Sequence, residues 1–262
     1  MILGILQARV SSTRLPGKVL MPILGESMLL RQVERVRRAT RVGRLMVATS
    51  IDPSDDPIEK LCRGNGVSVF RGSLDDVLDR FYRAAMPLAP DHVVRLTGDC
   101  PLADPELIDR VISFCLEGGF DYASNVVDPT FPDGLDVEVF RFSCLEQAWK
   151  EAGLPSQREH VTLFIHQQPG RFRIGSFRGE VDLSGLRWTV DGPEDFELVT
   201  EIYAALYPGN KEFTTRDVLD LLGRRPELAT LNAHCGRNEG LRKSREEDLL
   251  HLGKKPGKDD RV

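Results

Sequence analysis

The residues best suited to chemistry in this sequence stand close together near its start. Between an apolar run at 2–6 and the first helical pattern, the segment 7–18 holds Arg9, Arg14 and Lys18 together with three hydroxyl side chains and one glycine. Arginine offers forked donors and lysine a point charge, and both suit phosphate oxygens. Hydroxyls and free backbone N–H groups can complete such an anion site. A solvated basic loop would have the same composition, so the pattern alone leaves both interpretations open.

The segment does not match the two best-known phosphate-binding loops. A Walker P-loop requires glycine where this chain has Ser12, and serine or threonine where it has Val19. No Gly-x-Gly-x-x-Gly pattern follows the apolar run, so a dinucleotide fingerprint is excluded there. A loop between the first strand and the first helix of an α/β unit still lies at the carboxyl edge of the sheet, where such folds bind ligands.

Two acids follow predicted strands and are candidates for the same edge. Asp99 comes after the predicted strand 93–96, in a turn that contains glycine and proline, and Asp191 comes after the predicted strand 186–190. Carboxylate, phosphate and water oxygens are the ligands that Mg²⁺ prefers. A turn cap at Asp99 and a helix N-cap at Asp191, ahead of Pro193, would explain both acids without any function.

The elements around these residues alternate between strand and helix. Strands are predicted at 2–6, 45–48, 67–70 and 93–96, and helices at 27–39, 56–64, 74–86 and 104–117. This alternation predicts an α/β fold, in which helices cover both faces of a mostly parallel sheet. Further strands at 121–124, 135–140, 172–177 and 186–190 predict a small β-containing insertion in the second half.

Local signals predict where the helices of the second half begin and where the domain ends. Ser143-x-x-Glu146 and Ser156-x-x-Glu159 have the form of capping boxes. A single domain is expected over 1–236. The tail 237–262 is charged and contains Gly253, Pro256 and Gly257, so it is expected to be flexible, at least from 246.

The bulk composition limits the classes of protein that are possible. With 262 residues and 41% hydrophobic residues the chain can bury a large core, and its net charge of -5 argues against a general nucleic-acid binder. No apolar stretch approaches the ~20 residues that span a bilayer, and no secretory signal is recognisable. Five cysteines without a C-x-x-C pair favour neither disulfides nor structural zinc, so a reduced, cytoplasmic setting is expected.

The basic segment also resembles a known family signature. The run Gln-Ala-Arg-Val-Ser-Ser-Thr-Arg-Leu-Pro-Gly-Lys at 7–18 resembles the signature of sugar cytidylyltransferases, which include the enzymes that make CMP-3-deoxy-manno-octulosonate and CMP-sialic acids. Two further motifs agree with it, Gly-Asp-x-Pro at 98–101 and Asp-x-Pro-Glu-Asp at 191–195. From Ile2 to about Ser244 the chain looks like the spore coat polysaccharide biosynthesis protein F group of that superfamily.

The resemblance implies a Rossmann-like nucleotide-binding sheet and a set of nucleotide-binding residues. It implies that Arg9, Arg14 and Lys18 bind the triphosphate of CTP, and that Asp99 and Asp191 bind Mg²⁺. Arg14, Lys18 and Asp99 would be the catalytic residues. Further CTP contacts are implied at Leu6, Ala8, Arg71, Ser73 and Thr97. Many relatives have glutamine at the position of Thr97, so a glutamine-like contact to the nucleotide is in doubt here.

The resemblance also implies the reaction and the acceptor side of the site. CTP and an acidic or hydroxyl-bearing sugar would give a CMP-sugar and pyrophosphate, for surface polysaccharide biosynthesis. Asp136, Arg158 and His160 are candidate contacts to the sugar, although an ordinary surface strand also explains Asp136. A homodimer is expected, with no nucleic-acid or membrane partner. The alternatives are a glycosyltransferase that uses a nucleotide-sugar donor and a non-catalytic nucleotide-binding partner; the three cations of the segment suit a triphosphate better than a diphosphate.

Overall fold

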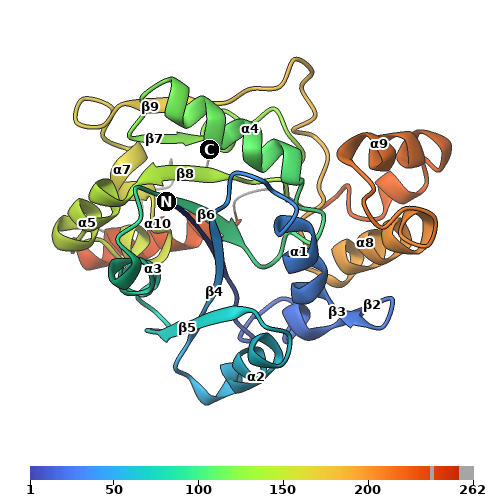
Figure 1. The fold of residues 1–262 in the computed structure, drawn as a ribbon, viewed down its shortest axis with the longest axis horizontal. Coiled ribbons are helices and arrows are strands. Elements are labelled where there is room, and N and C mark those ends of the chain that lie inside the picture. Colours follow the sequence, from blue (N-terminus) through green and yellow to red (C-terminus); the bar gives the residue numbers. More distant parts are fainter. Residues whose placement is uncertain (237–238, 254–262) are drawn as a thin grey trace.

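The computed structural model describes residues 1–236 and 239–253, and its centre is a seven-stranded sheet with the order β5-β4-β1-β6-β8-β7-β9. The first four strands in this order are parallel, as expected. They are β5 (Ser68–Gly72), β4 (Arg44–Ser50), β1 (Ile2–Gln7) and β6 (His92–Thr97). The strand that precedes the basic segment therefore lies inside the sheet, between β4 and β6 (Figure 1).

The strands of the second half extend the same sheet. They are β7 (Tyr122–Ser124), β8 (Glu138–Arg141) and β9 (Ile174–Ser176). β8 runs antiparallel to both β6 and β7, whereas β9 is parallel to β7. The predicted strand at 186–190 is wrong, because only an isolated bridge joins Arg187 to Asp133 there. Its Val190 amide instead bonds to the Asp99 carbonyl at 2.7 Å, so this segment passes across the end of β6.

Helices cover both faces of the sheet, each over its own apolar core (Figure 1). One face carries α1 (Met28–Val36), α2 (Asp56–Gly64), α4 (Pro105–Glu117), α8 (Pro193–Leu206) and α9 (Thr215–Arg224). The other carries α3 (Val77–Ala85), α5 (Phe142–Glu151), α6 (Pro155–Glu159), α7 (Leu163–His166) and α10 (Glu239–His251). Strand alternation divides β1 between the two cores, with Leu3 and Ile5 in one and Leu6 in the other.

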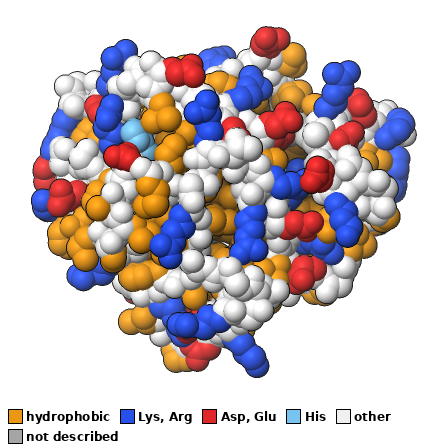
Figure 2. Space-filling view, in the orientation of Figure 1, with side chains coloured by type: hydrophobic (Ala, Val, Ile, Leu, Met, Phe, Trp, Pro, Cys, Tyr) orange, Lys and Arg blue, Asp and Glu red, His pale blue; other side chains and the backbone are white. Residues whose placement is uncertain are grey.

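Short elements complete the chain. They are the hairpin β2 (Pro22–Ile23) and β3 (Glu26–Ser27), and the 3₁₀ turns η1 (Lys18–Leu20), η2 (Pro53–Asp55), η3 (Met86–Leu88) and η4 (Leu228–Thr230). No helix in the described ranges is long and apolar enough to cross a membrane. On the face drawn in Figure 2, acidic and basic side chains are intermixed.

Both predicted capping boxes are wrong. α5 begins at Phe142, one residue before the expected cap, and no side chain caps it. Ser156 lies inside α6, where its hydroxyl donates to Asp248 Oδ2 at 2.5 Å and its amide to Asp248 Oδ1 at 2.9 Å. Asp248 belongs to α10, so a long-range contact uses the side chain that the local pattern assigned to capping.

The helix α10 also departs from the flexible tail that the composition suggested. Residues 239–251 form this helix, which packs against α6. Ser244 contributes a second contact, because its hydroxyl donates to Glu159 Oε2 at 2.5 Å. The expectation of a flexible tail otherwise falls on 237–238 and 254–262, which lie outside the described residues.

Candidate active site

Lys18 lies between the two predicted acids. Its Nζ is 2.9 Å from Asp191 Oδ1 and 3.4 Å from Asp99 Oδ2, and it donates to the Val190 carbonyl at 2.6 Å. The lysine is only 7% exposed, so it is not a solvated surface cation. The structure therefore brings together three residues from the β1 loop, the end of β6 and the start of α8, as the sequence predicted.

Backbone geometry places Lys18 and Asp99 at this edge. Gly17, just before η1, has φ 73°, a left-handed conformation that favours glycine. Gly98 lies so close to β1 that a Cβ there would be 2.8 Å from the Gln7 carbonyl oxygen. Its amide donates to that same oxygen at 2.7 Å. The turn after β6 can therefore pass close to β1 only with glycine at this position.

The ionisation of Lys18 and Asp99 is mutually stabilised. Burial opposes the charged form of Lys18, but Asp99 and Asp191 outweigh it, so the pKa of Lys18 is raised. Burial likewise opposes the charged form of Asp99, but Lys18 and a hydrogen bond from Thr97 outweigh it, so the pKa of Asp99 is lowered. The site therefore holds an ammonium and a carboxylate in their charged forms at neutral pH.

Arg187 is the main site residue that the sequence analysis missed. Its guanidinium contacts three carboxylates: Asp133 Oδ2 at 2.8 Å, Asp191 Oδ2 at 2.9 Å and Asp195 Oδ1 at 2.9 Å. Asp195 in turn accepts the amides of residues 191 and 192 at the start of α8. Arg14 also contacts Asp191 Oδ2, at 2.9 Å. The only sequence signal was the spacing of this arginine, which stands four residues before Asp191 and eight residues before Asp195.

The other predicted triphosphate and nucleotide residues lie along the same edge. Leu6 and Ala8 are buried at the end of β1, and Arg9 is exposed. Thr97 ends β6 and bonds to Asp99 through its hydroxyl. Arg9 has a buried neighbour that the sequence analysis missed, because burial and the charge of Arg9 lower the pKa of Arg80 to about 10.

Arg71 and Ser73 make contacts within the protein. Arg71 pairs with Asp56 Oδ1 at 2.7 Å and Glu59 Oε2 at 2.8 Å, and donates to the Ser50 carbonyl at 2.8 Å. The Ser73 hydroxyl accepts the Asp76 amide at 3.0 Å. These contacts give Arg71 a structural role in joining β5 to α2. A direct contact of either residue with the nucleotide stays a prediction.

The predicted acceptor residues are distributed around a buried polar network. Glu138 is 5% exposed; it pairs with Arg95 and accepts the Tyr122 hydroxyl at 2.7 Å and the Thr162 hydroxyl at 2.5 Å. Burial opposes the charged form of Glu138, but Arg95 outweighs it, so its pKa is lowered. The sequence pattern marked the strand of Glu138 and not this residue.

Of the acceptor candidates, His160 interacts with this network, whereas Asp136 and Arg158 have other neighbours. His160 lies near Arg95: burial, followed by the charge of Arg95, lowers its pKa. Asp136 lies near Cys100, whose pKa it helps to raise after burial and Asp99. Arg158 instead donates from Nε to both oxygens of Asp76 at 3.0 Å, which ties α6 to the start of α3.

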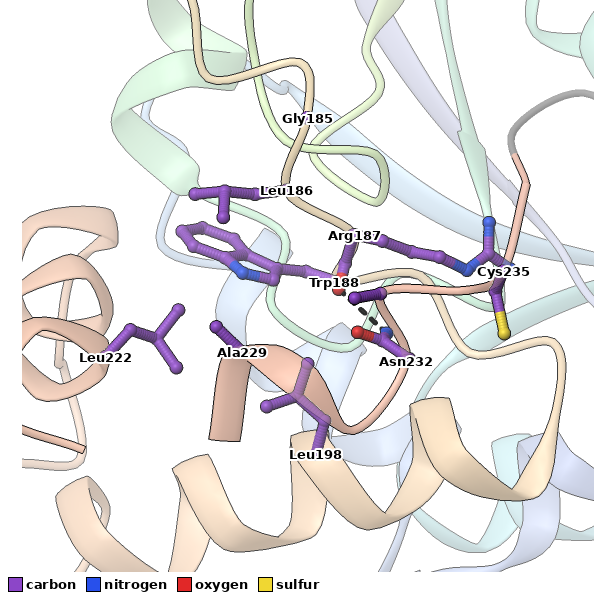
Figure 3. A pocket seen from close by; sticks show the side chains of 10 residues that line it. Gly185, Leu186, Arg187, Trp188, Leu198, Leu222, Ala229, Asn232 and Cys235 are labelled. Carbon is purple, nitrogen blue, oxygen red and sulfur yellow. Dashed lines mark hydrogen bonds between the residues drawn. The ribbon is translucent and has the colours of Figure 1, made fainter. Parts of the chain in front are cut away.

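A separate cavity lies beside Arg187 and contains neither Lys18 nor the acids next to it (Figure 3). The side chains of Trp188, Leu198 and Leu222 surround it in an apolar wall. Its side-chain amide donor, Asn232 Nδ2, already donates to the Arg187 carbonyl at 3.0 Å and to Asp195 Oδ1 at 2.7 Å. The cavity is therefore separate from the site that Lys18, Asp99 and Asp191 form.

Within 1–236 and 239–253, no group of three or more His, Cys, Asp or Glu side chains could hold a metal ion. Asp99 and Asp191 nevertheless each direct one oxygen to the same point, which Lys18 Nζ occupies. Magnesium commonly takes one or two carboxylates and completes its shell with substrate phosphates and water. Binding of that ion by Asp99 and Asp191, together with phosphate oxygens, stays a prediction.

Comparison with known proteins decides the family. A family model described as Cytidylyltransferase matches residues 3–216, which include the β1 loop and both acids. The chain belongs to the cytidylyltransferase family. It is 36% identical to the spore coat polysaccharide biosynthesis protein SpsF of Bacillus subtilis, over 87% of this chain and 97% of SpsF. It is 39% identical to an uncharacterized protein of Methanocaldococcus jannaschii, over 89% of this chain and 95% of that protein.

Solved structures agree with this membership. A cytidylyltransferase from Leptospira borgpetersenii superposes with a TM-score of 0.83 at 33% identity, and covers 87% of this chain and 96% of its own. A CMP:2-keto-3-deoxy-manno-octonic acid synthetase complexed with CTP has a TM-score of 0.62 at 21% identity, over 78% of this chain and 98% of its own. The second likeness establishes a shared fold.

Proposed function

We propose that this cytidylyltransferase transfers CMP from CTP to a sugar, with release of pyrophosphate. The observation that carries the proposal is the meeting of Lys18 with Asp99 and Asp191 at the carboxyl edge of the sheet. A buried cation beside two acids, next to a loop with two more cations, suits a polyphosphate and its counter-ion. The name of the CTP-bound synthetase of the same fold supports CTP as the nucleotide.

In the proposed reaction an oxygen of the sugar attacks the α-phosphorus in line. The bond from that phosphorus to the bridging oxygen breaks, and the electron pair leaves with pyrophosphate. Arg9, Arg14 and Lys18 neutralise the charge that accumulates on the leaving group. Burial opposes the charged form of Lys18, but Asp99 and Asp191 raise its pKa, so it is charged at neutral pH. The protein's contribution is positioning and charge neutralisation, without a covalent intermediate.

We assign Asp99 and Asp191 as the residues that would hold Mg²⁺. When bound there with CTP, the ion would neutralise and polarise phosphate oxygens. Lys18 would then exchange its carboxylate contacts for phosphate oxygens. Arg14 and Arg187 stay on the second oxygen of Asp191 and keep this carboxylate oriented.

We place the sugar beside the Arg95–Glu138 network, with Asp136 and His160 as its nearest candidate contacts. An acidic, ulosonic-type sugar is proposed because the 3-deoxy-manno-octulosonate cytidylyltransferase of Zea mays is 41% identical over 113 residues, 42% of this chain and 37% of that enzyme. The network lies on β6 and β8, next to Asp99, so a sugar there would face the α-phosphate. The homodimer stays a prediction that light scattering can check.

The test is turnover with CTP, Mg²⁺ and a panel of ulosonic acids, with pyrophosphate and CMP-sugar measured together. Formation of both in equal amounts supports the proposal. Nucleoside diphosphate release from a nucleotide-sugar donor would instead indicate a glycosyltransferase. CTP binding without turnover of any sugar in the panel would favour a non-catalytic nucleotide-binding protein.

A further inference from the structure

Asp55, at the end of η2, has an unusual environment for a carboxylate. It is 0% exposed, and its oxygens accept from three neutral donors: the Val10 amide at 2.7 Å, the Ser50 amide at 3.1 Å and the Ser50 hydroxyl at 2.5 Å. Its charge also acts on the buried Arg80, whose pKa it helps to raise against the effects of burial and of Arg9. Burial of a carboxylate is expensive unless hydrogen bonds satisfy it, and these three donors satisfy it here.

Val10, the residue that Asp55 binds, is the point where the basic loop closes on itself. The Val10 carbonyl accepts the Ser12 amide at 2.8 Å and the Gly17 amide at 3.0 Å. The first bond forms a tight turn at the beginning of the loop, and the second joins that beginning to the end of the loop, directly before Lys18. The amide of the same residue is bound by Asp55. The conformation of the loop therefore depends on the position of the Val10 backbone.

Asp55 connects this point to the neighbouring strand. Ser50 is the last residue of β4, and its amide and hydroxyl hold the second oxygen of Asp55. The chain Ser50–Asp55–Val10 thus fixes the loop to the rigid edge of the sheet, on the side away from the Asp99 turn. Arg9, next to Val10, is exposed and so is available to a ligand above the loop.

We propose that Asp55 is a positioning residue for the nucleotide, which acts through Val10 to hold the basic loop in its binding conformation. The inference rests on the proposed function, because it assigns the loop to a triphosphate. Asp55 itself touches no substrate. A loop that is already ordered loses less conformational entropy when the ligand binds, so the anchor increases affinity without adding a contact. It also keeps the loop cations aligned with the reacting phosphates.

The main variant is Asp55→Asn, which keeps the size of the side chain. Its Nδ2 would face the backbone amide of either Val10 or Ser50, so one of these two amide bonds is lost, whereas the Ser50 hydroxyl can rotate and accept from Nδ2. The matched control is Asp109→Asn, because Asp109 accepts the same set of donors: two backbone amides, of Thr40 and Arg41, and the Thr40 hydroxyl. Asp109 lies on α4, away from the loop.

The experiment measures the Kd of the full-length variants for CTP with Mg²⁺, well below the lowest melting temperature. We expect Asp55→Asn to raise this Kd at least tenfold, and Asp109→Asn to change it less than twofold even where it lowers the melting temperature equally. Amide exchange at Ser12 and Gly17 should accelerate in Asp55→Asn alone. If Asp55→Asn does not fold, Val10→Pro removes the same donor, leaves the Asp55–Ser50 bonds intact and should raise the Kd in the same way.

The outcomes separate this inference from the proposed function. Wild-type CTP affinity in folded Asp55→Asn, or in Val10→Pro, overturns the positioning role while the proposed function stands. Equal rises in Kd for Asp55→Asn and Asp109→Asn also overturn it, because they indicate a general loss of stability. Absence of CTP binding by the wild-type protein would overturn the proposed function itself.

Discussion

Lys18 Nζ and Asp191 Oδ1 are 2.9 Å apart, although 173 positions separate the two residues in the chain. This pair closes the site between the loop after the first strand and the start of α8. Because Asp99 contacts the same ammonium, a single cation joins two acids from different parts of the fold, and Arg14 and Arg187 add further positive charge beside Asp191. A triphosphate and its metal ion would each compete for one side of this contact.

Replacement of Lys18 by alanine should therefore affect rate more than binding. We expect kcat to fall at least a hundred-fold, the usual effect of removing a charged contact that strengthens in the transition state. Stability should fall by less than the ~3 kcal/mol typical of breaking a fully buried pair, because Arg14 and Arg187 still contact Asp191. Pyrophosphate release per folded protein measures the first effect. The control is Lys150→Ala, on the exposed side of α5. Wild-type turnover in Lys18→Ala would show that the loop has no part in catalysis.

Asp99→Asn tests the metal assignment. Without the second carboxylate, we expect loss of turnover and loss of the extra thermal stabilisation that Mg²⁺ adds to CTP. A ligand at 100 times its Kd stabilises by ~2.7 kcal/mol, which a melting experiment detects readily. EDTA should remove the activity of the wild-type protein in the same assay. Unchanged turnover in EDTA would exclude a divalent ion from the reaction.

Glu138→Gln should make the free energy of unfolding less dependent on pH in the acid range. The pKa of Glu138 is lowered below its ordinary value of 4.5, so its contribution to folding is present above that value and is lost as the pH falls through the folded pKa. At pH 7 we expect a loss of ~3–5 kcal/mol, because Arg95 remains buried without its partner. Urea unfolding should show a smaller difference between the two proteins at about pH 3 than at pH 7. A difference that is the same at both pH values would contradict the assignment.

Arg187→Lys should be strongly destabilising despite conserving the charge. The guanidinium reaches Asp133, Asp191 and Asp195 with separate nitrogens, and an ammonium cannot reproduce that fork. We expect a loss of roughly 3 kcal/mol, or about 6–12 °C in melting temperature for a chain of this size. Arg225→Lys is the control, since Arg225 also contacts two carboxylates but at an exposed position. Equal melting temperatures for both variants would contradict this account.

The sequence predicted the parallel half of the sheet and the edge of the sheet at which the candidate site residues lie. Each predicted strand from the first to the fourth exists, and Asp99 and Asp191 meet the loop cation at Lys18 as expected. The strand predictions succeeded because apolar runs are local signals, whereas Asp191 meets Lys18 although the strand predicted before it does not form. The family resemblance supplied the nucleotide, which residue spacing alone could not.

The failures concern contacts between distant segments. Arg187 reaches its partners because the segment after Gly185 crosses the end of β6. The hydropathy of that segment indicated a strand instead, so these contacts could not be predicted. The role of Asp55 depends on its contacts with Val10 and Ser50, which lie in other segments of the chain. Arg95 and Glu138 form a pair because β6 and β8 are antiparallel neighbours in the sheet, and no local sequence pattern indicates this pairing.

The central place of β1 has a consequence for synthesis on the ribosome. This strand is made first, yet both of its neighbours come later, β4 at Arg44–Ser50 and β6 at His92–Thr97. The apolar residues of β1 therefore have one neighbour, β4, early and lack the other until β6 has emerged, and such non-local pairing is slow. Lys18 likewise gains its two carboxylates at different times, Asp99 with the turn after β6 and Asp191 much later, just before α8. The complete site therefore forms only after the segment before α8 has been synthesised.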